Sequence, residues 1–388
     1  MKRSTDRILS THAGSLPRPP DLREMLAAKA SRQPVDEAAF NQRVRGAVAD
    51  VVQQQLASGM DVVNDGELSK VNFLHYARER IGGIEERRPP PDQGPPTAGI
   101  SGRDAREFPE YFAEDTGRRQ IGAGLGHKEL FCTGPLTYVG QAAVQADVDN
   151  FKAALQGKSP TEAFLPAVAP GSIEHWLGNV YYPNEEAFLY GIADAMHEEY
   201  KAIVDAGFLL QIDDPGLADS WQMHPDLSVA EYRKLAALHV DALNHALRDV
   251  PPDRVRFHMC WGSYHGPHKY DISLRDIVDL ILKVKAVGYS IEASNPRHAH
   301  EWRVWADVKL PEGKVLIPGV VGHATDFIEH PELVAERLLT YANLVGREQV
   351  IAGTDCGLGT RVGHPHIAWA KFQALAEGAQ LATQRLWG

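Results

Sequence analysis

The residues best suited to chemistry in this chain are the histidine and the cysteine of Phe-His-Met-Cys, residues 257–260. They end an apolar run typical of a buried strand, and side chains two apart on a strand point to the same face. His258 and Cys260 could therefore be two ligands of one metal ion, and their nitrogen and sulfur atoms suit a borderline-soft ion such as zinc. Glu292 follows 32 residues after Cys260, and Cys356 follows 64 residues after Glu292, so further side chains of metal-ligand type recur along the chain.

The elements that must position these side chains alternate between strands and helices. Apolar runs predict buried strands, and amphipathic patterns between them predict helices at 271–286 and 330–344. Repeated βα units form a parallel sheet, so we predict an α/β fold, a (β/α)8 TIM barrel. The C-terminal ends of the barrel strands meet at one mouth, which would bring the four side chains together. The predicted strands of this half are 208–213, 254–260, 287–294, 314–321 and 349–353.

The N-terminal half is less regular. Residues 61–65 predict a strand that leads into the loop Gly-Glu-Leu-Ser-Lys, and residues 159–184 read as irregular. A stretch rich in Pro, Gly and Arg predicts a long insertion at about 83–130. Loops of this length in compact domains commonly cover an active site. We therefore expect a single catalytic domain, residues 1–388, whose barrel carries this insertion.

Composition limits the classes of partner. The net charge of −11 disfavours nucleic acid and anionic membrane surfaces, and no apolar run reaches the roughly 20 residues of a membrane span. Three cysteines, Cys132, Cys260 and Cys356, are too few for a disulfide framework and suggest reduced thiols. The N-terminus lacks the apolar run of a signal peptide, so we expect a cytoplasmic enzyme with small-molecule partners. Oligomeric state is not predicted.

Spacing alone leaves two interpretations of the histidine and the cysteines open. Free cysteine is commonly a small buried hydrophobe, and a lone histidine is commonly a hydrogen-bonded core residue. The alternative is a shared metal site, but Glu292 and Cys356 are too remote in sequence to count as one motif.

Seven stretches, in order along almost the whole chain, make it resemble the catalytic half of cobalamin-independent methionine synthase. The resemblance implies a barrel that binds zinc through His258, Cys260, Glu292 and Cys356. Zinc makes a bound thiol deprotonate, and the thiolate is the nucleophile, while Glu292 would be the exchangeable ligand. The matching stretches are residues 11–18, 62–70, 134–140, 210–220, 257–263, 289–294 and 353–361.

The resemblance also implies a substrate site. Glu67 and Asp213 match the carboxylates that hold the ammonium group of an amino-acid thiol, of which homocysteine is the family example. The backbone of Ala13, Gly14 and Ser15 matches the loop that receives its carboxylate. Methyl-folate is the donor that the family implies. Transfer from a tertiary amine requires protonation of the leaving nitrogen, and His323 is the nearest match to the family's histidine.

Some features depart from the family. Its additional N-terminal half has no counterpart in this sequence, which puts the use of a polyglutamated folate in question. Its aromatic folate platform should follow Gly-Pro-Leu-Thr, yet Tyr138, Val139 and Gly140 follow here without a nearby tryptophan. The loop 265–270 would contact substrate. The insertion would offer arginines to an anionic donor or form a solvated loop, and those arginines are Arg87, Arg88, Arg118 and Arg119.

These features predict a zinc-dependent thiol S-methyltransferase that resembles the enzyme of methionine synthesis from methyl-folate and homocysteine. The alternative is alkyl transfer to another thiol, as in epoxyalkane:coenzyme M transferases or the demethylation of a xenobiotic. A sulfonated thiol has no ammonium group for Glu67 and Asp213, which favours the first function. A barrel that only binds or stores metal or thiol is a third class, and the paired acids argue against it.

Overall fold

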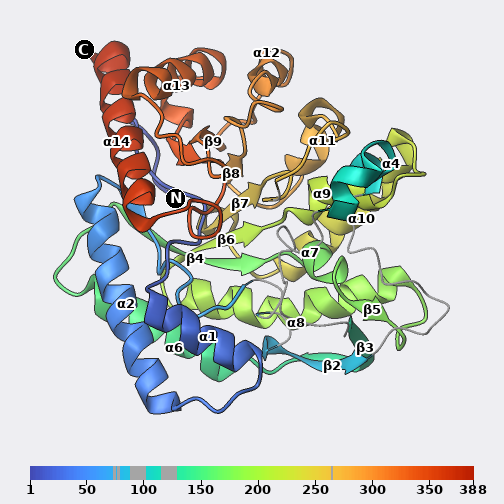
Figure 1. The fold of residues 1–388 in the computed structure, drawn as a ribbon. Coiled ribbons are helices and arrows are strands. Elements are labelled where there is room, and N and C mark those ends of the chain that lie inside the picture. The colour runs from blue at the N-terminus through green and yellow to red at the C-terminus, as the bar shows by residue number, and fades with distance from the viewer. Residues whose placement is uncertain (73–75, 77–78, 88–101, 115–128, 264) are drawn as a thin grey trace.

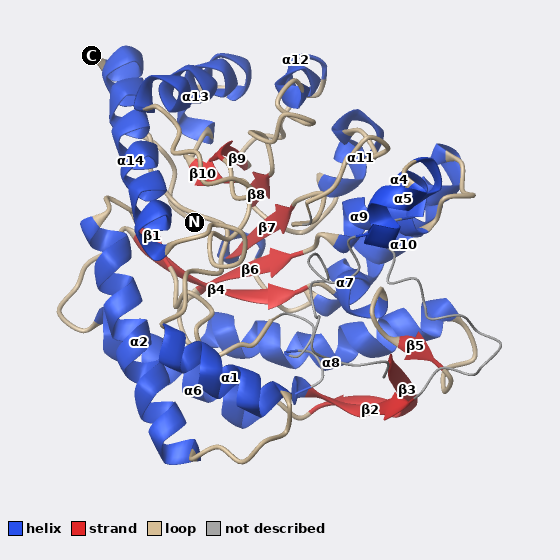
Figure 2. Cartoon of the chain, in the orientation of Figure 1, coloured by secondary structure: helices blue, strands red, loops and turns tan. Residues whose placement is uncertain are grey.

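A parallel sheet of seven strands forms the centre of the computed structural model, which describes residues 1–72, 76, 79–87, 102–114, 129–263 and 265–388 (Figures 1 and 2). The strand order is β1-β4-β6-β7-β8-β9-β10, and neighbouring strands run parallel. The strands are β1 (Val62–Val63), β4 (Glu162–Val168), β6 (Leu209–Asp213), β7 (Val255–Met259), β8 (Gly288–Ile291), β9 (Val315–Val321) and β10 (Gly353–Thr354).

The N-terminal segment closes this sheet into a barrel. Ser10 forms a parallel bridge with Ala352, whose amide donates to the carbonyl oxygen of Leu9 over 2.8 Å. On its other side, the amide of Val62 donates to the carbonyl oxygen of Ser10 over 3.1 Å. Together with the seven strands, this segment makes the eight parallel strands of a (β/α)8 barrel. The TIM-barrel prediction is confirmed.

Helices cover the outside of the barrel (Figure 1). Ser273 caps α11 (Leu274–Ile281) at the amide of Asp276, so this helix is shorter than the predicted 271–286. The predicted helix at 330–344 is α13 (Pro331–Val345). None of the described helices is long and apolar enough to cross a membrane. The remaining long helices are α1 (Pro20–Ala30), α2 (Glu37–Ala57), α6 (Gln141–Leu155), α8 (Glu185–Asp205), α10 (Val229–Ala246) and α14 (Pro365–Trp387).

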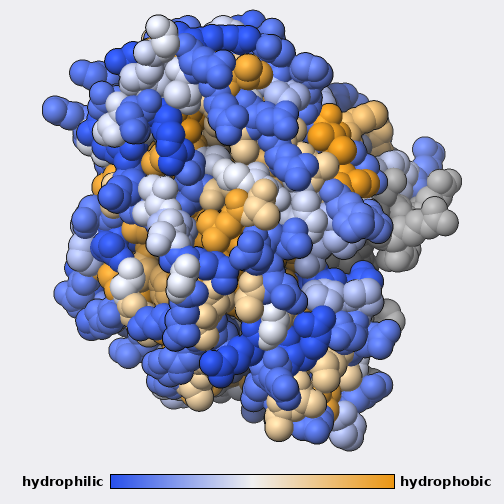
Figure 3. Space-filling model, turned by 90° about the vertical axis from the view of Figure 1, so that its left-hand side faces the viewer, coloured by the Kyte–Doolittle hydropathy of each residue, from blue (hydrophilic) through white to orange (hydrophobic). Residues whose placement is uncertain are grey.

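The outer faces of these helices are polar. Figure 3 views the molecule from the side of α2 and α14, where apolar residues occur as separate groups within a largely hydrophilic surface. The apolar sides face inward: Phe40, Val44 and Val48 of α2 and Phe372 of α14 belong to the same buried cluster. Burial of these amphipathic faces against the sheet holds the helices in place.

The prediction that residues 159–184 are irregular was wrong. Glu162–Val168 is the barrel strand β4, which pairs with β1 on one side and β6 on the other. Pro166 lies inside this strand, opposite Gln211. Proline cannot donate to a sheet, so Pro166 weakens the pattern of a central strand, although the predicted strand β9 contains Pro318. A short helix, α7 (Pro170–Glu174), follows the strand.

The predicted insertion contributes to a second sheet. Strands β2 (Ile81–Arg87) and β3 (Glu129–Tyr138) pair antiparallel, and β5 (Gly178–Asn179) joins β3, outside the barrel. Two short helices, α4 (Gly102–Glu107) and α5 (Pro109–Glu114), lie near α9 (Gly216–Met223) at the mouth (Figure 2). Arg87, the last residue of β2, is exposed and pairs with Glu85 over 3.0 Å. Arg88, Arg118 and Arg119 lie outside the described residues.

Candidate metal centre and substrate cavity

A histidine and two cysteines meet at the mouth of the barrel. His258 and Cys260 come from the end of β7, and Cys356 comes from the loop after β10, three places further round the sheet. One ligand atom of each lies within 4.8 Å of the others. His258 and Cys260 are buried, and Cys356 is half-buried. This spacing suits one shared metal ion, because zinc binds sulfur at about 2.3 Å and imidazole nitrogen at about 2.0 Å.

The ring of His258 is prepared for a ligand. Its Nδ1 hydrogen-bonds with the hydroxyl of Ser290 on β8 over 3.1 Å. Its Nε2 is buried and has no hydrogen-bond partner among the described residues. A histidine that binds a metal through one ring nitrogen normally hydrogen-bonds through the other. The unpartnered Nε2 beside two sulfur atoms therefore fits a metal such as zinc.

The two thiols differ in the direction of their pKa shifts. Interaction with Cys356 raises the pKa of Cys260 well above the ordinary thiol value. Interaction with Cys260 lowers the pKa of Cys356 well below that value. Burial lowers the pKa of His258, but interaction with Cys356 outweighs it, so the net direction is upward. A thiol with a lowered pKa ionises more readily, and the thiolate is the form that binds a cation.

Glu292 lies in an adjacent buried group rather than with the sulfur atoms. Its carboxylate oxygen is within 4.8 Å of ligand atoms of His323 and Asp355. Oε2 accepts from the amide of Trp261 over 2.9 Å, and Oε1 accepts from Nδ2 of Asn295 over 3.0 Å. The structure thus brings three of the four predicted ligands together and holds the fourth beside them.

His323 belongs to the second group of ligand-type side chains, with Glu292 and Asp355. Its side chain is 2% exposed, and neither ring nitrogen has a hydrogen-bond partner among the described residues. The described side chains that line the cavity do not include it. Asp355 accepts hydrogen bonds from the amides of Ala293 and Ser294 over 2.7 and 2.9 Å. Burial raises the pKa of Asp355 to about 7. The role of His323 as a proton donor stays a prediction.

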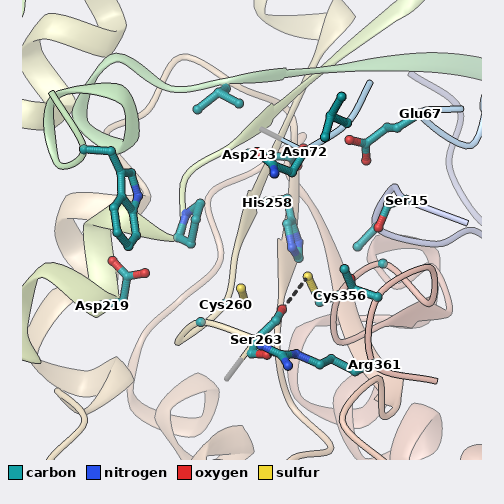
Figure 4. Close-up of a pocket in the computed structure, with 18 of the residues that line it drawn as sticks. Ser15, Glu67, Asn72, Asp213, Asp219, His258, Cys260, Ser263, Cys356 and Arg361 are labelled. Atoms are coloured by element: carbon teal, nitrogen blue, oxygen red, sulfur yellow. Dashed lines mark hydrogen bonds between the residues drawn. The ribbon is translucent and has the colours of Figure 1, made fainter. Parts of the chain in front are cut away.

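A cavity of about 350 Å³ opens in front of the sulfur atoms (Figure 4). Its lining includes four of the predicted substrate residues, Ala13, Ser15, Glu67 and Asp213. The fifth, Gly14, has a φ of +133°, and a Cβ at this position would lie 2.6 Å from Oε1 of Glu67. Only glycine permits this approach of the loop to the carboxylate. The loops after the N-terminal segment and after β1, together with the end of β6, thus reach one cavity although they are distant in sequence.

The loop that carries Glu67 is held by a hydrogen bond within the loop and by two hydrogen bonds from Arg18. Glu67 has a φ of +52°, and its amide donates to Oδ1 of Asp65 over 3.0 Å. Nη2 of Arg18 donates to the carbonyl oxygens of Glu67 and Lys70 over 2.9 and 2.7 Å. Burial raises the pKa of Glu67 above the ordinary value. A bound cation would offset this cost and favour the ionised carboxylate.

Asp213 is fixed at the end of β6. Nε2 of Gln211 donates to Oδ1 of Asp213 over 2.7 Å and to the carbonyl oxygen of Ala13 over 2.9 Å. Gln211 and Asp213 are two apart on the strand and share a face. Burial raises the pKa of Asp213 to about 7. One glutamine therefore ties the predicted ammonium-binding carboxylate to the predicted carboxylate-binding loop.

Sequence reasoning missed several cavity residues, four of them with side chains that could bind a ligand. Trp176 and Asp219 line the cavity, as do Arg18 and Arg361. The sequence had suggested that no tryptophan serves the site, because none follows Gly-Pro-Leu-Thr. That motif lies in β3, outside the barrel, whereas Trp176 follows the barrel strand β4 and the helix α7. Recognising β4 would have placed this tryptophan at the mouth.

The Ser290→Ala substitution is expected to reduce zinc affinity by roughly 10- to 100-fold, because loss of a hydrogen bond to a ligand histidine typically costs this much. Without the hydroxyl, the imidazole of His258 loses the partner that orients it. Competition with a chromophoric chelator would measure the affinity. Ser228→Ala, at the cap of α10, is the matched control and should leave it unchanged. Equal affinity in the two variants would contradict the orientation of His258 by Ser290.

Comparisons with known proteins agree with this geometry. The model of the family described as cobalamin-independent synthase, catalytic domain, matches residues 182–380. Methionine synthase of Saccharolobus solfataricus is 26% identical over 382 residues, which are 97% of this chain and 95% of that protein. Methionine synthase of Thermococcus kodakarensis is 24% identical over 96% of this chain and 93% of that protein.

Solved structures show a similar fold. A B12-independent methionine synthase from Shewanella sp. W3-18-1, in complex with selenomethionine, superposes with a TM-score of 0.72 at 19% identity. The superposition covers 98% of this chain and 99% of the other. A protein from Listeria monocytogenes, described as a putative vitamin-B12-independent methionine synthase, has a TM-score of 0.64 at 16% identity, over 98% and 99% of the two chains.

Proposed function

The chain belongs to the family of cobalamin-independent synthase catalytic domains, and on this premise we propose that it transfers a methyl group from methyl-folate to the thiol of homocysteine in a zinc-dependent reaction. The product would be methionine. One observation carries the proposal: a single cavity holds His258, Cys260 and Cys356 together with two buried carboxylates, Glu67 and Asp213. The first group suits thiol chemistry, and the second suits an amino acid.

The zinc ion would be held by His258, Cys260 and Cys356, with Glu292 as the exchangeable fourth ligand. When bound, it supplies the positive charge that keeps a substrate thiol deprotonated at neutral pH. Glu292 accepts hydrogen bonds from the amide of Trp261 and from Nδ2 of Asn295, so its carboxylate would keep hydrogen-bond donors when it is not bound to the metal. Ser290 orients the histidine.

The amino-acid part of the thiol would lie between the carboxylates of Glu67 and Asp213 on one side and the backbone of the loop 13–15 on the other. Glu67 and Asp213 would hold the ammonium group, since a cation offsets the cost of burying two carboxylates. The loop 13–15 would receive the carboxylate through its backbone, where Gly14 allows close approach. Gln211 keeps the two parts in register because it bonds to both.

The donor would occupy the side of the cavity lined by Trp176 and Asp219. An indole offers a face for stacking a planar ring such as the pterin of methyl-folate. Oδ1 of Asp219 is buried without a hydrogen-bond partner among the described residues, and burial raises the pKa of this carboxyl well above its ordinary value. It would hydrogen-bond to polar atoms at the ring edge. His323 remains our candidate for protonating the leaving nitrogen.

Alkyl transfer to a sulfonated thiol such as coenzyme M is the second candidate. Arg361 favours it, because this cationic side chain lines the cavity and has a buried nitrogen without a partner among the described residues. Glu67 and Asp213 count against it, because a sulfonated thiol without an amine leaves both carboxylates without a cation.

Titration calorimetry of the zinc-loaded protein with four thiols tests the proposal. Homocysteine is expected to bind more tightly than coenzyme M, glutathione and cysteine, and to release a proton as its thiol ionises. The zinc-free protein is the control and should show no such proton release. Binding of coenzyme M with no response to homocysteine would overturn the proposal and turn the search for a donor to epoxides and methylated xenobiotics.

A further inference from the structure

Arg361 lies on a loop that is locked against the substrate site. This loop joins β10 to α14 and lines the cavity beside Cys356 (Figure 4). The amide of Gly359 donates to the carbonyl oxygen of Ser15 over 2.9 Å. A Cβ at Gly357 would come within 2.4 Å of Oγ of Ser15, so the two loops are in direct contact. The Arg361 side chain is itself held, because Nε donates to the carbonyl oxygen of Ser263.

The guanidinium of Arg361 has hydrogen-bonding capacity left over. Its Nη2 is buried and has no partner, and Arg361 forms no ion pair within the part of the chain that the structure describes. Arg18, the other arginine of the cavity, also has a buried nitrogen without a partner among the described residues, its Nε, but its Nη2 already donates to two carbonyl oxygens. A buried N–H without an acceptor costs free energy, so the arrangement fits an acceptor that arrives with a ligand.

Charges of opposite sign occupy different parts of the cavity. Figure 4 shows Glu67 and Asp213 above the sulfur atoms and Arg361 below them. Oγ of Ser263 donates to Sγ of Cys356 over 3.4 Å, which places the Ser263–Arg361 pair next to the sulfur. Arg361 is therefore placed to meet an anionic group of the thiol substrate. Glu67 and Asp213 on one side of the sulfur atoms and Arg361 on the other complement a zwitterion, which carries one ammonium and one carboxylate. Asp219 and Arg18 also line the cavity.

From these contacts we propose that Arg361 binds the α-carboxylate of the amino-acid thiol and so selects thiols that carry one. The proposal rests on the proposed function and names the chemical group that the site reads. The guanidinium would meet the carboxylate from one side while the backbone of the Ala13–Ser15 loop meets it from the other. Arginine suits this task because its planar fork matches the two oxygens of a carboxylate.

A comparison of two thiols tests the proposal. Homocysteine and 3-aminopropane-1-thiol share the thiol and the amine, and only homocysteine has the carboxylate. In zinc-loaded Arg361→Gln, the calorimetric Kd for homocysteine is expected to rise by roughly 10- to 100-fold, the usual cost of a lost hydrogen bond to a charged group. The Kd for 3-aminopropane-1-thiol should stay within about 2-fold of the wild-type value, since no carboxylate is present.

Two further variants control for charge and for folding. Arg361→Lys keeps the positive charge without the fork and should lie between the wild type and Arg361→Gln for homocysteine. Arg45→Gln removes an exposed arginine of α2 and should bind both thiols as the wild type does. Zinc content and thermal melting of each variant show whether metal and fold are retained.

Several outcomes would overturn the assignment. Equal weakening for both thiols would mean that the guanidinium stabilises the thiolate, and no weakening for either would mean that it binds neither. Binding of coenzyme M by the wild type that is lost in Arg361→Gln, without a change for homocysteine, would assign the residue to a sulfonate. If the wild type binds neither homocysteine nor 3-aminopropane-1-thiol, the proposed function itself is contradicted, and the assignment of Arg361 falls with it.

Discussion

Replacing Cys356 by serine is expected to abolish zinc retention and to lower kcat/KM by at least roughly 10³-fold, beyond the 10- to 100-fold cost of losing an outer hydrogen-bond partner. A serine hydroxyl is a harder and far less acidic ligand than a thiol, so it does not replace the thiolate. Cys356 also carries the lowered pKa of the thiol pair. Its loss removes the negative charge at the centre of the group.

The matched control for this variant is Cys132→Ser. Cys132 is fully buried in β3, outside the barrel, and it is the one cysteine of the sequence that is not a predicted ligand. Both variants lose one thiol, but only Cys356→Ser should lose zinc after dialysis against a weak chelator. Metal content would be measured by inductively coupled plasma mass spectrometry, and folding by circular dichroism. Stoichiometric zinc in a folded Cys356→Ser variant would contradict the ligand assignment.

Asp213→Asn is expected to raise the KM for homocysteine by roughly 10- to 100-fold with a much smaller change in kcat, as for the loss of a hydrogen bond to a charged group. The amide keeps the shape of the side chain and removes the charge that would pair with the ammonium group. Gln211 can still bond to the remaining carbonyl oxygen, so the Ala13 loop should keep its place. The effect therefore reports charge rather than loop position.

Asp214→Asn supplies the comparison, because Asp214 is adjacent in sequence and its carboxylate is also removed from solvent. Its Oδ1 accepts from Ser172 over 2.8 Å, and the residue does not contribute to the described cavity lining. This variant should alter stability more than the KM for homocysteine. A second probe is 4-mercaptobutyrate, which lacks the amine and should bind Asp213→Asn as well as it binds the wild type. An unchanged KM for homocysteine in Asp213→Asn would show that this residue does not hold the ammonium group.

The sequence by itself determined the architecture and the direction of the metal-binding side chains. Apolar runs one βα unit apart predict parallel strands, as at β7, and also at β9 although Pro318 lies inside it. The two-residue period of a strand puts His258 and Cys260 on one face whatever surrounds them. Such features are local, because backbone periodicity depends on neighbouring residues alone.

Other features depended on contacts between distant parts of the chain. The barrel strand β4 was missed, and with it the place of Trp176 at the mouth. The short segment around Ser10 becomes a strand only because Ala352 and Val62 flank it. Neither fact follows from local pattern, because in each case the neighbouring strands supply the hydrogen bonds that the segment lacks by itself.

The division of the site into groups was also decided by tertiary structure. Sequence and family resemblance named four ligands together, whereas the folded chain holds Glu292 beside His323 and Asp355, bonded to the Trp261 amide. Likewise, nothing in the sequence around Arg361 reveals that one of its nitrogens is buried without an acceptor. Residue types fix what a side chain can bind, but only packing decides which partners it has already found and which it still lacks.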